Sequence, residues 1–139
     1  LTTEKCKGAQ NPSYMRNPST SELDQWLASS KGLLKKIALA PEREGTAEFI
    51  SYACKRGVVV ALGHSDATYQ EAVEAVEAGA SVWVHAYNGM RGLNHREPGM
   101  VGAVYDIPNT YAELICDGHH VSLWLVTSLC NKRVMTMWL

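Results

Sequence analysis

Several features that define whole classes of protein are missing from this 139-residue sequence. Its 13 basic and 14 acidic residues are spread along most of the chain, so there is no basic stripe of the kind that predicts nucleic-acid binding. No apolar run reaches the roughly 20 residues that a bilayer span requires, and the first residues lack the apolar core of a signal peptide. We therefore expect a soluble, cytoplasmic protein that binds neither nucleic acid nor membranes.

Cysteine is scarce, and the four cysteines are widely spaced. Cys6, Cys54, Cys116 and Cys130 include no pair at C-x-x-C spacing, which argues against a zinc ribbon or a dithiol redox motif. We expect reduced thiols rather than a disulfide framework, with Cys54 and Cys116 buried. The sequence also has no initiating methionine, so we expect the chain to begin inside a longer reading frame.

What the sequence does contain is an alternation of helix and strand patterns in an ordinary globular composition, 46% hydrophobic and 19% charged. Helices are predicted over residues 20–30, 46–55 and 68–79, and strands over residues 35–42, 58–63, 81–87 and 110–118. Ser65 or Asp66 is the expected cap of the third helix. A long glycine-rich loop is predicted over residues 88–103.

This order predicts an α/β fold. Each step from one strand to the next through a helix takes about 20 residues, which is the spacing of a parallel sheet with right-handed crossovers. Residues 58–63 are apolar on both faces, as expected of a buried parallel strand. Four strands are too few to close a barrel. The spacing therefore leaves two architectures open, half of a (β/α)₈ barrel or the middle of an open doubly wound sheet.

Histidines stand at the ends of two consecutive predicted strands, His64 and His85. The carboxyl ends of parallel strands meet at one edge of a sheet, and neighbouring strands lie about 4.8 Å apart. Two imidazoles there can each reach one metal ion at about 2.1 Å. A single histidine at a strand end is often only a hydrogen-bonded polar residue. Two in succession, with more in the run from Asp117 to His120 after the next strand, favour a mononuclear metal site.

The loop after His85 offers two further candidates. Arg96 lies beside Glu97 and ahead of a Pro-Gly turn, and arginine binds phosphate through two parallel hydrogen bonds. The alternative is that Arg96 and Glu97 only pair with each other. Asn88 and Gly89 can present backbone N–H groups to an oxyanion or a phosphate near the metal, although an Asn-Gly pair is mostly a turn signal.

Six motifs taken together resemble a known family. They are KGAQNP, LAPE, GHSDATY, VHAYNGM, HREPGMVGA and ICDGHHV. Their order and spacing resemble those of N-acetylglucosamine-6-phosphate deacetylases, which are metal-dependent (β/α)₈ barrels of the amidohydrolase superfamily. The resemblance covers residues 1–122, whereas residues 123–139 form a divergent apolar tail. It implies a partial TIM barrel of about four βα units, with His64 and His85 as ligands of a divalent metal, Zn or Fe.

The same resemblance implies five substrate-binding residues. The backbone of Asn88 and Gly89 matches the segment near the sugar phosphate, and Arg96 matches a phosphate-binding arginine. His120 matches the histidine that contacts the sugar and its carbonyl region. Gln10 occupies a position near the substrate where some members carry histidine.

Two parts of the family pattern are missing. The third metal ligand is a glutamate in an E-G-P-F motif that would end at Leu1-Thr2, and Glu4 comes too late to replace it. The general acid/base is an aspartate in a T-D-A motif, but the sequence contains no Asp or Glu after Asp117. We therefore expect no catalytic acid/base in this chain. A truncated gene or a shifted reading frame would explain both.

For the intact enzyme, the resemblance implies hydrolysis of N-acetylglucosamine 6-phosphate to glucosamine 6-phosphate and acetate. We expect that enzyme to be a cytoplasmic homo-oligomer, and the 139 residues to be inactive alone. Two alternatives stay open. One is a non-catalytic metal-binding fragment that folds only with a partner. The other is a different amidohydrolase, such as a dihydroorotase-like cyclic-amide hydrolase, whose substrates have no phosphate for Arg96 to hold.

Overall fold

The structure, a computed structural model, describes residues 4–132. Two sequence expectations lie outside the described residues: the end of the E-G-P-F motif at Leu1-Thr2, and the end of the apolar tail at residues 133–139.

A single four-stranded parallel sheet runs through the molecule in the order β1-β2-β3-β4. The strands are β1 (Lys36–Leu39), β2 (Val59–Leu62), β3 (Val82–Trp83) and β4 (Tyr111–Ala112). Strands that are consecutive in sequence are therefore neighbours in space. The prediction of four parallel strands is confirmed, although β3 and β4 are much shorter than their apolar runs.

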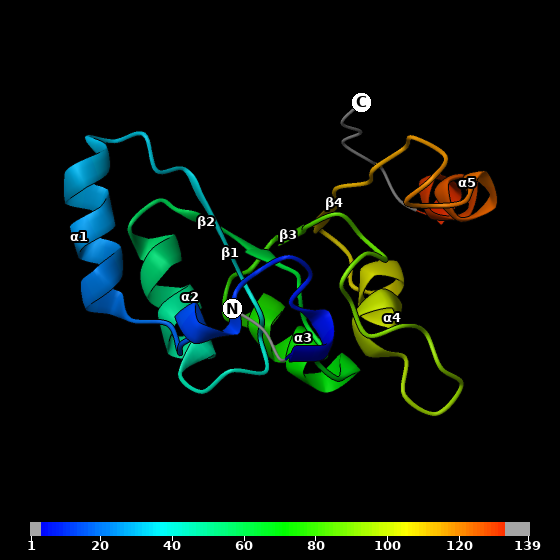
Figure 1. The fold of residues 1–139 in the computed structure, drawn as a ribbon, viewed down its shortest axis with the longest axis horizontal. Helices are drawn as coiled ribbons and strands as arrows, with labels where there is room; N and C mark the ends of the chain where they lie inside the picture. Colours follow the sequence, from blue (N-terminus) through cyan, green and yellow to red (C-terminus); the bar gives the residue numbers. More distant parts are fainter. Residues whose placement is uncertain (1–3, 133–139) are drawn as a thin grey trace.

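The described helices are α1 (Thr20–Ser30), α2 (Thr46–Lys55), α3 (Tyr69–Glu77), α4 (Gly99–Asp106) and α5 (Leu123–Lys132), with short 3₁₀ turns at Glu4–Cys6 and Pro12–Tyr14. Of these, α2, α3 and α4 lie in a row along one side of the sheet (Figure 1). A doubly wound sheet carries helices on both faces, whereas a (β/α)₈ barrel carries them only outside. The row α2, α3 and α4 therefore decides between the two architectures in favour of part of a barrel.

An ion pair shows that the other face of the sheet is concave. Lys36 at the start of β1 pairs with Glu113, which directly follows β4, although two strands separate β1 from β4. Lysine and glutamate side chains can meet across that span only if the sheet curls and tilts, as barrel strands do.

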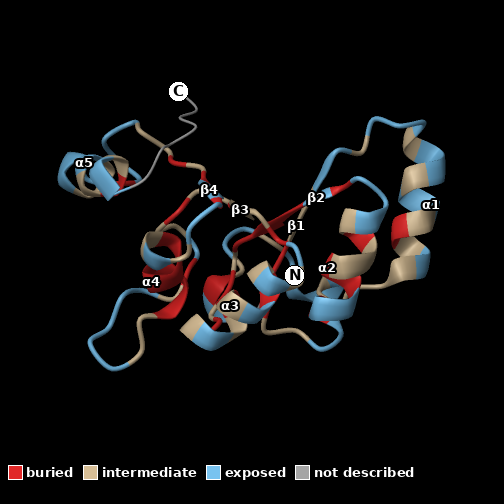
Figure 2. Ribbon diagram, turned by 180° about the vertical axis from the view of Figure 1, so that it is seen from behind, coloured by how far each residue is buried: buried red, intermediate tan, exposed pale blue. Residues whose placement is uncertain are grey.

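The core lies between the sheet and its helices. Figure 2 shows buried residues along the strands and on the inner faces of α3 and α4, with α5 mostly exposed. Trp83, the largest fully buried side chain, donates from its indole N–H to Thr110 Oγ1 at 2.8 Å. Cys6 is buried, whereas Cys54 and Cys116, expected in the core, are only partly buried at its margin. None of the described helices is long and apolar enough to cross a membrane.

The third helix begins later than the sequence predicts. Its N-cap is Thr68, whose hydroxyl oxygen accepts from Glu71 N at 3.2 Å while a Glu71 carboxylate oxygen accepts from Thr68 N at 2.7 Å. This reciprocal capping box satisfies two of the free N–H groups at the helix start. The predicted caps Ser65 and Asp66 are wrong because tertiary contacts at the rim of the sheet engage both side chains.

The loop predicted over residues 88–103 is also partly wrong, because α4 begins at Gly99. One carboxylate oxygen of Glu97 accepts the N–H of Gly99 at 2.9 Å and that of Tyr69 at 2.7 Å. Glu97 thus satisfies N–H groups at the starts of α3 and α4 together. These hydrogen bonds hold the pKa of Glu97 below its usual range. No hydrogen bond or ion pair joins the described side chains of Arg96 and Glu97, so the alternative that they only pair with each other is wrong.

The described part of the divergent tail packs on the domain through α5. Leu129 is fully buried. Tyr87 donates its hydroxyl to the carbonyl of Leu125 at 3.1 Å, and Tyr105 donates to Ser128 Oγ at 3.2 Å. The prediction of a domain ending at residue 122 remains a prediction.

Candidate metal centre

The two strand-end histidines come together at the rim of the sheet. His64 lies two positions after the end of β2, and His85 lies two positions after the end of β3. Their Nε2 atoms lie 3.0 Å apart. The ring centroids are 4.7 Å apart and the ring planes are nearly perpendicular, at 85°. The sequence prediction that these imidazoles converge is confirmed in position.

Backbone carbonyls hold the other nitrogen of each ring. His64 Nδ1 lies 3.0 Å from the carbonyl oxygen of Cys6, and His85 Nδ1 lies 2.9 Å from that of Asn88. A carbonyl oxygen can only accept, so both Nδ1 atoms carry the hydrogen. In the neutral rings, both Nε2 atoms then present lone pairs.

Two lone pairs 3.0 Å apart repel each other unless the two nitrogens share a proton or bind a metal ion. A divalent ion satisfies both, because the separation allows each Nε2 to lie within the bonding distance of about 2.0–2.1 Å. Backbone carbonyls that bind the second nitrogen are the usual outer contacts of metal-ligating histidines. The pair therefore fits a metal site. Within residues 4–132, no third His, Cys, Asp or Glu joins it to make a group of three.

Both histidines have an unusual backbone conformation, which determines the direction in which their rings point. His64 has φ +50° and His85 has φ +34°, and Tyr87 in the same loop has φ +77°. The left-handed region costs a residue with a Cβ about 1–2 kcal/mol. Such strain persists only where surrounding contacts hold it, and it gathers at functional sites.

Two glycines make room for the His64 ring. A Cβ on Gly8 would lie 3.2 Å from His64 Cε1, and a Cβ on Gly89 would lie 3.2 Å from His64 Nδ1. Both glycines have positive φ, +61° and +58°. The Lys7-Gly8 turn, far away in sequence, therefore closes over the imidazole together with the loop after His85.

The loops after β2 and β3 are bound to each other as well as to their histidines. Ser65 N donates to the carbonyl of Gly89 at 2.8 Å, and Arg91 N donates to the carbonyl of Ser65 at 2.9 Å. Asp66 accepts from Lys5 Nζ at 2.9 Å and from Arg91 Nη2 at 3.2 Å. The Lys5 ammonium, and secondly the Arg91 guanidinium, hold the pKa of Asp66 below its usual range.

The residues predicted to lie near the substrate phosphate differ in their surroundings. Asn88 and Gly89 lie in the rim, and their carbonyls hold His85 and Ser65. The Asn88 side-chain Nδ2 is buried without a hydrogen-bond partner among the described residues. Arg96 is exposed, and within residues 4–132 its guanidinium makes no hydrogen bond or ion pair.

The other two predicted substrate residues lie outside the histidine pair's contacts. His120 donates from Nδ1 to an Asp117 carboxylate oxygen at 2.7 Å, and Asp117 also accepts the backbone N–H groups of His119 and His120. These backbone hydrogen bonds are the main reason that the pKa of Asp117 lies well below its usual range. Gln10 is half-buried at the end of the turn that contains Gly8.

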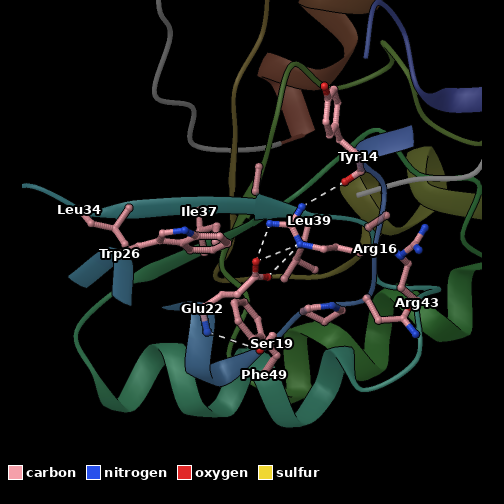
Figure 3. A pocket seen from close by; sticks show the side chains of 14 residues that line it. Tyr14, Arg16, Ser19, Glu22, Trp26, Leu34, Ile37, Leu39, Arg43 and Phe49 are labelled. Carbon is pink, nitrogen blue, oxygen red and sulfur yellow. Dashed lines mark hydrogen bonds and ion pairs between the residues drawn. The ribbon is translucent and has the colours of Figure 1, made fainter. Parts of the chain in front are cut away.

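Two cavities flank β1. One, of about 350 Å³, opens beside His85 on the concave face and is lined by Lys36, Val84, His85, Glu113, Leu114 and Ile115. Another, of about 370 Å³, lies between α1 and β1, where Trp26, Ile37 and Phe49 give it an apolar wall (Figure 3). Only the first touches a candidate metal ligand, and its volume is at the lower end of the range for small-molecule sites.

Sequence reasoning missed the residues that support the pair: the Cys6 carbonyl, Gly8, and the contacts of Glu42, Asp66 and Arg91. Cys6 and His64 are 58 positions apart in sequence. No local pattern links them, so only co-variation among homologues could have signalled the contact.

Curated proteins with similar sequences are hexosamine-phosphate deacetylases. The chain is 49% identical over 119 residues to an N-acetylglucosamine-6-phosphate deacetylase of Vibrio furnissii, covering 86% of this chain and 30% of that protein. It is 50% identical over 119 residues to an N-acetylgalactosamine-6-phosphate deacetylase of Escherichia coli O157:H7, covering 86% of this chain and 32% of that protein. The chain thus spans about a third of the length of these relatives. No family model matches it.

Solved structures agree with these sequence matches. A mutant N-acetyl-D-glucosamine-6-phosphate deacetylase from Mycobacterium smegmatis, in complex with N-acetyl-D-glucosamine-6-phosphate, superposes with a TM-score of 0.91 at 31% identity, covering 99% of this chain and 38% of that one. The N-acetylglucosamine-6-phosphate deacetylase of Pasteurella multocida superposes with a TM-score of 0.88 at 33% identity, covering 98% of this chain and 36% of that one.

Proposed function

Because the chain belongs to the N-acetylhexosamine-6-phosphate deacetylase family over the part of those proteins that it spans, we propose that it forms the metal-binding rim of such a deacetylase. The proposed reaction is hydrolysis of the acetamide of N-acetylglucosamine 6-phosphate to glucosamine 6-phosphate and acetate. The observation that carries the proposal is the pair of Nε2 atoms 3.0 Å apart, each on a ring held through Nδ1 by a backbone carbonyl.

In this proposal, His64 and His85 hold one divalent cation, Zn²⁺ or Fe²⁺. When bound, that ion would supply Lewis-acid polarisation of the acetamide carbonyl and lower the pKa of the attacking water. The carbonyls of Cys6 and Asn88 keep both rings in the ligating tautomer. The protein thereby orients its ligands before any ion binds.

The substrate contacts follow from charge and exposure. The Arg96 guanidinium is exposed, and no described carboxylate pairs with it, so it can bind the 6-phosphate through two parallel hydrogen bonds. Asp117 fixes the orientation of His120 through the Nδ1–H, and Nε2 points away from that bond. Only the protonated ring carries a hydrogen on Nε2 as well, and in that form it can donate to the carbonyl oxygen as negative charge develops. The backbone of Asn88 and Gly89, and Gln10, complete the proposed substrate side.

The 139 residues alone should bind a divalent ion weakly and should not turn over. The described residues offer no group of three potential ligands, and the sequence has no Asp or Glu after Asp117 to act as a general base. Loss of a general base typically costs about 10²–10⁴ in rate. This supports a second candidate, a non-catalytic metal-binding fragment that requires a partner chain.

The test replaces the matching segment of the Vibrio furnissii enzyme, to which the chain is 49% identical, with residues 4–122 of this chain. We expect the chimera to release acetate, and the same chimera with His64→Ala to lose that activity. A folded chimera that binds zinc as the host does but releases no acetate would contradict the proposal. Assays with both the gluco and galacto substrates decide the epimer, since relatives of both kinds match equally well.

The isolated chain is assayed in parallel. Turnover by the pure 139-residue protein, abolished by His64→Ala, would show that it carries its own proton-transfer group and would overturn the expectation of inactivity. Restored turnover on mixing with a separately produced fragment that carries the E-G-P-F motif would favour the partner-dependent candidate.

A further inference from the structure

The rim contains a carboxylate that neither the proposed metal binding nor the proposed substrate contacts use. Glu42 lies in the turn after β1, and β1 is the neighbour of β2, the strand that leads to His64. We propose that Glu42 is a positioning residue for His64: it fixes the two residues after His64 and thereby holds that imidazole in its ligating direction. The inference rests on the proposed function for its purpose, but its geometry stands independently.

Both oxygens of the Glu42 carboxylate are used within one short segment. Ser65 Oγ donates to Oε2 at 2.7 Å, and the backbone N–H of Asp66 donates to Oε1 at 2.9 Å. Hydrogen bonds to a charged acceptor are roughly twice as strong as neutral ones. The Glu42 carboxylate therefore holds the segment after His64 at two points, the side chain of Ser65 and the backbone of Asp66.

Ser65 connects this carboxylate to the rest of the rim. It is fully buried, and its Oγ also accepts from Ala67 N at 3.0 Å. Its backbone N–H donates to the carbonyl of Gly89 at 2.8 Å. A buried hydroxyl that loses its acceptor is left with an unsatisfied donor, which makes substitution of Glu42 costly at this point.

The conformation of His64 needs such support. Its φ of +50° is unfavourable for a residue with a Cβ. On one side, Gly63 N donates to the carbonyl of Leu39 at 3.1 Å. On the other side, Glu42 holds Ser65 and Asp66. If the second support is released, His64 can relax its backbone, and the ring then leaves both the Cys6 carbonyl and His85.

His85 is an internal control. Its Nδ1 is held by the carbonyl of Asn88, within its own loop, and Glu42 makes no contact with that loop among the described residues. A positioning role for Glu42 therefore predicts a change at His64 alone. A general structural role predicts similar changes at both rings.

The experiment uses the 139-residue protein and compares Glu42→Ala with Glu44→Ala. Glu44 is exposed two residues further on and makes no hydrogen bond among the described residues, so the control removes the same charge from the same segment. Long-range ¹H–¹⁵N spectra of the histidine rings report the tautomer of each ring. They are recorded without metal, about one pH unit above the ordinary histidine pKa of about 6.5.

In Glu42→Ala, we expect His64 to lose its Nδ1–H signature and become a mixture of tautomers, while His85 keeps its own. Cobalt(II) affinity should fall about 10–100-fold, the usual loss when an outer contact of a metal ligand is removed. Ser65→Ala removes one of the two hydrogen bonds and should give a smaller change in the same direction, which keeps the test decisive even if Glu42→Ala does not fold.

A His64 spectrum in both Glu42→Ala and Ser65→Ala that matches Glu44→Ala would overturn the positioning role, as would equal changes at His64 and His85. The spectra need neither metal nor substrate. They therefore separate failure of this inference from failure of the proposed function, for which the chimera assay is the test.

Discussion

The candidate site has two parts that are held by different kinds of contact. The histidine rim comprises residues 63–66 and 85–91, and the outer loops are the segments that carry Arg96 and His120. In the rim, the loop after β2 and the loop after β3 are bound to each other and to the distant residues Cys6 and Glu42. In the outer loops, Arg96 and His120 contact only their own segments, through Asn94 and Asp117. The loops that carry His64 and His85 are therefore tied together by long-range contacts, although the His85 ring itself is held within its own loop by Asn88. The side chains of Arg96 and His120 are exposed and lack such long-range contacts among the described residues.

The carboxylates show the same difference. Asp66 accepts from two cations that lie 61 and 25 positions away in sequence. Asp117 accepts only from residues two and three positions ahead of it. Long-range contacts require the whole fold and lose their effect when the fold is loosened, whereas contacts within a turn survive local opening. Four measurements test whether the rim and the outer loops are independent of each other.

The largest effect is expected on stability, from the buried Trp83 that packs beneath the rim. Trp83 is fully buried two residues before His85, and its indole N–H donates to Thr110. Trp83→Ala should lower the free energy of unfolding by about 3–5 kcal/mol, because it leaves a large cavity and removes the hydrogen bond from the indole N–H to Thr110. Urea unfolding followed by circular dichroism measures this.

Trp124→Ala is the matched control, since that tryptophan is 75% exposed and should change stability by no more than about 0.5 kcal/mol. Equal losses in the two variants would show that the rim does not rest on the core beneath it.

The second effect concerns metal binding by the rim. His64→Ala removes one of two ligands and should weaken zinc or cobalt binding by more than the roughly 10–100-fold that an outer contact contributes. Calorimetric titration of the 139-residue chain measures the affinity. His95, exposed in the outer loop, is the control, and His95→Ala should bind as the parent does. Unchanged affinity in His64→Ala would contradict the convergence of the two rings on one ion.

The third effect is a pH dependence in the outer loop. Backbone hydrogen bonds from His120 and His119 hold the pKa of Asp117 below its ordinary value of about 4. The stability that this carboxylate contributes is therefore fully present above about pH 4, and it is lost as the pH falls through the lower folded-state pKa. Asp117→Asn should accordingly be less stable than the parent at neutral pH, with the difference disappearing in acid.

Thermal unfolding midpoints recorded across the acid range measure this difference. Glu44→Gln, which removes an exposed carboxylate with no described hydrogen bond, should follow the parent at every pH. A difference between Asp117→Asn and the parent that grows as the pH falls would have the wrong sign for the proposed cause.

The smallest effect is expected at Arg96. Because its guanidinium makes no contact among the described residues, Arg96→Ala should leave stability within about 0.5 kcal/mol and metal affinity unchanged. In the chimeric enzyme, the same substitution should raise KM for the 6-phosphate substrate with little change for the unphosphorylated sugar. Loss of metal binding would show that the outer loops and the rim are a single unit.

The sequence alone predicted much of this molecule, because the relevant signals are local. Hydrophobic periodicity predicted four parallel strands and three of the helices, and parallel strand ends predicted that His64 and His85 would meet. It failed at α4, where Gly99 begins a helix inside a glycine-rich stretch. That helix start depends on Glu97 and on packing against α3, and neither has a short-range pattern.

Hydrophobic periodicity and chain direction are properties of the sequence, and they suffice to predict the alternation of strands and helices and the placement of an imidazole at each of two strand ends. The nitrogen that His64 presents depends on the tertiary structure, because the Cys6 carbonyl that holds its Nδ1 lies 58 positions away in the chain. The same is true of the 3.0 Å approach of the two Nε2 atoms, since His64 and His85 come from different loops. Hydrogen bonds of this kind depend on ångström-scale placement that exists only after the sheet has curled and its loops have closed over one another.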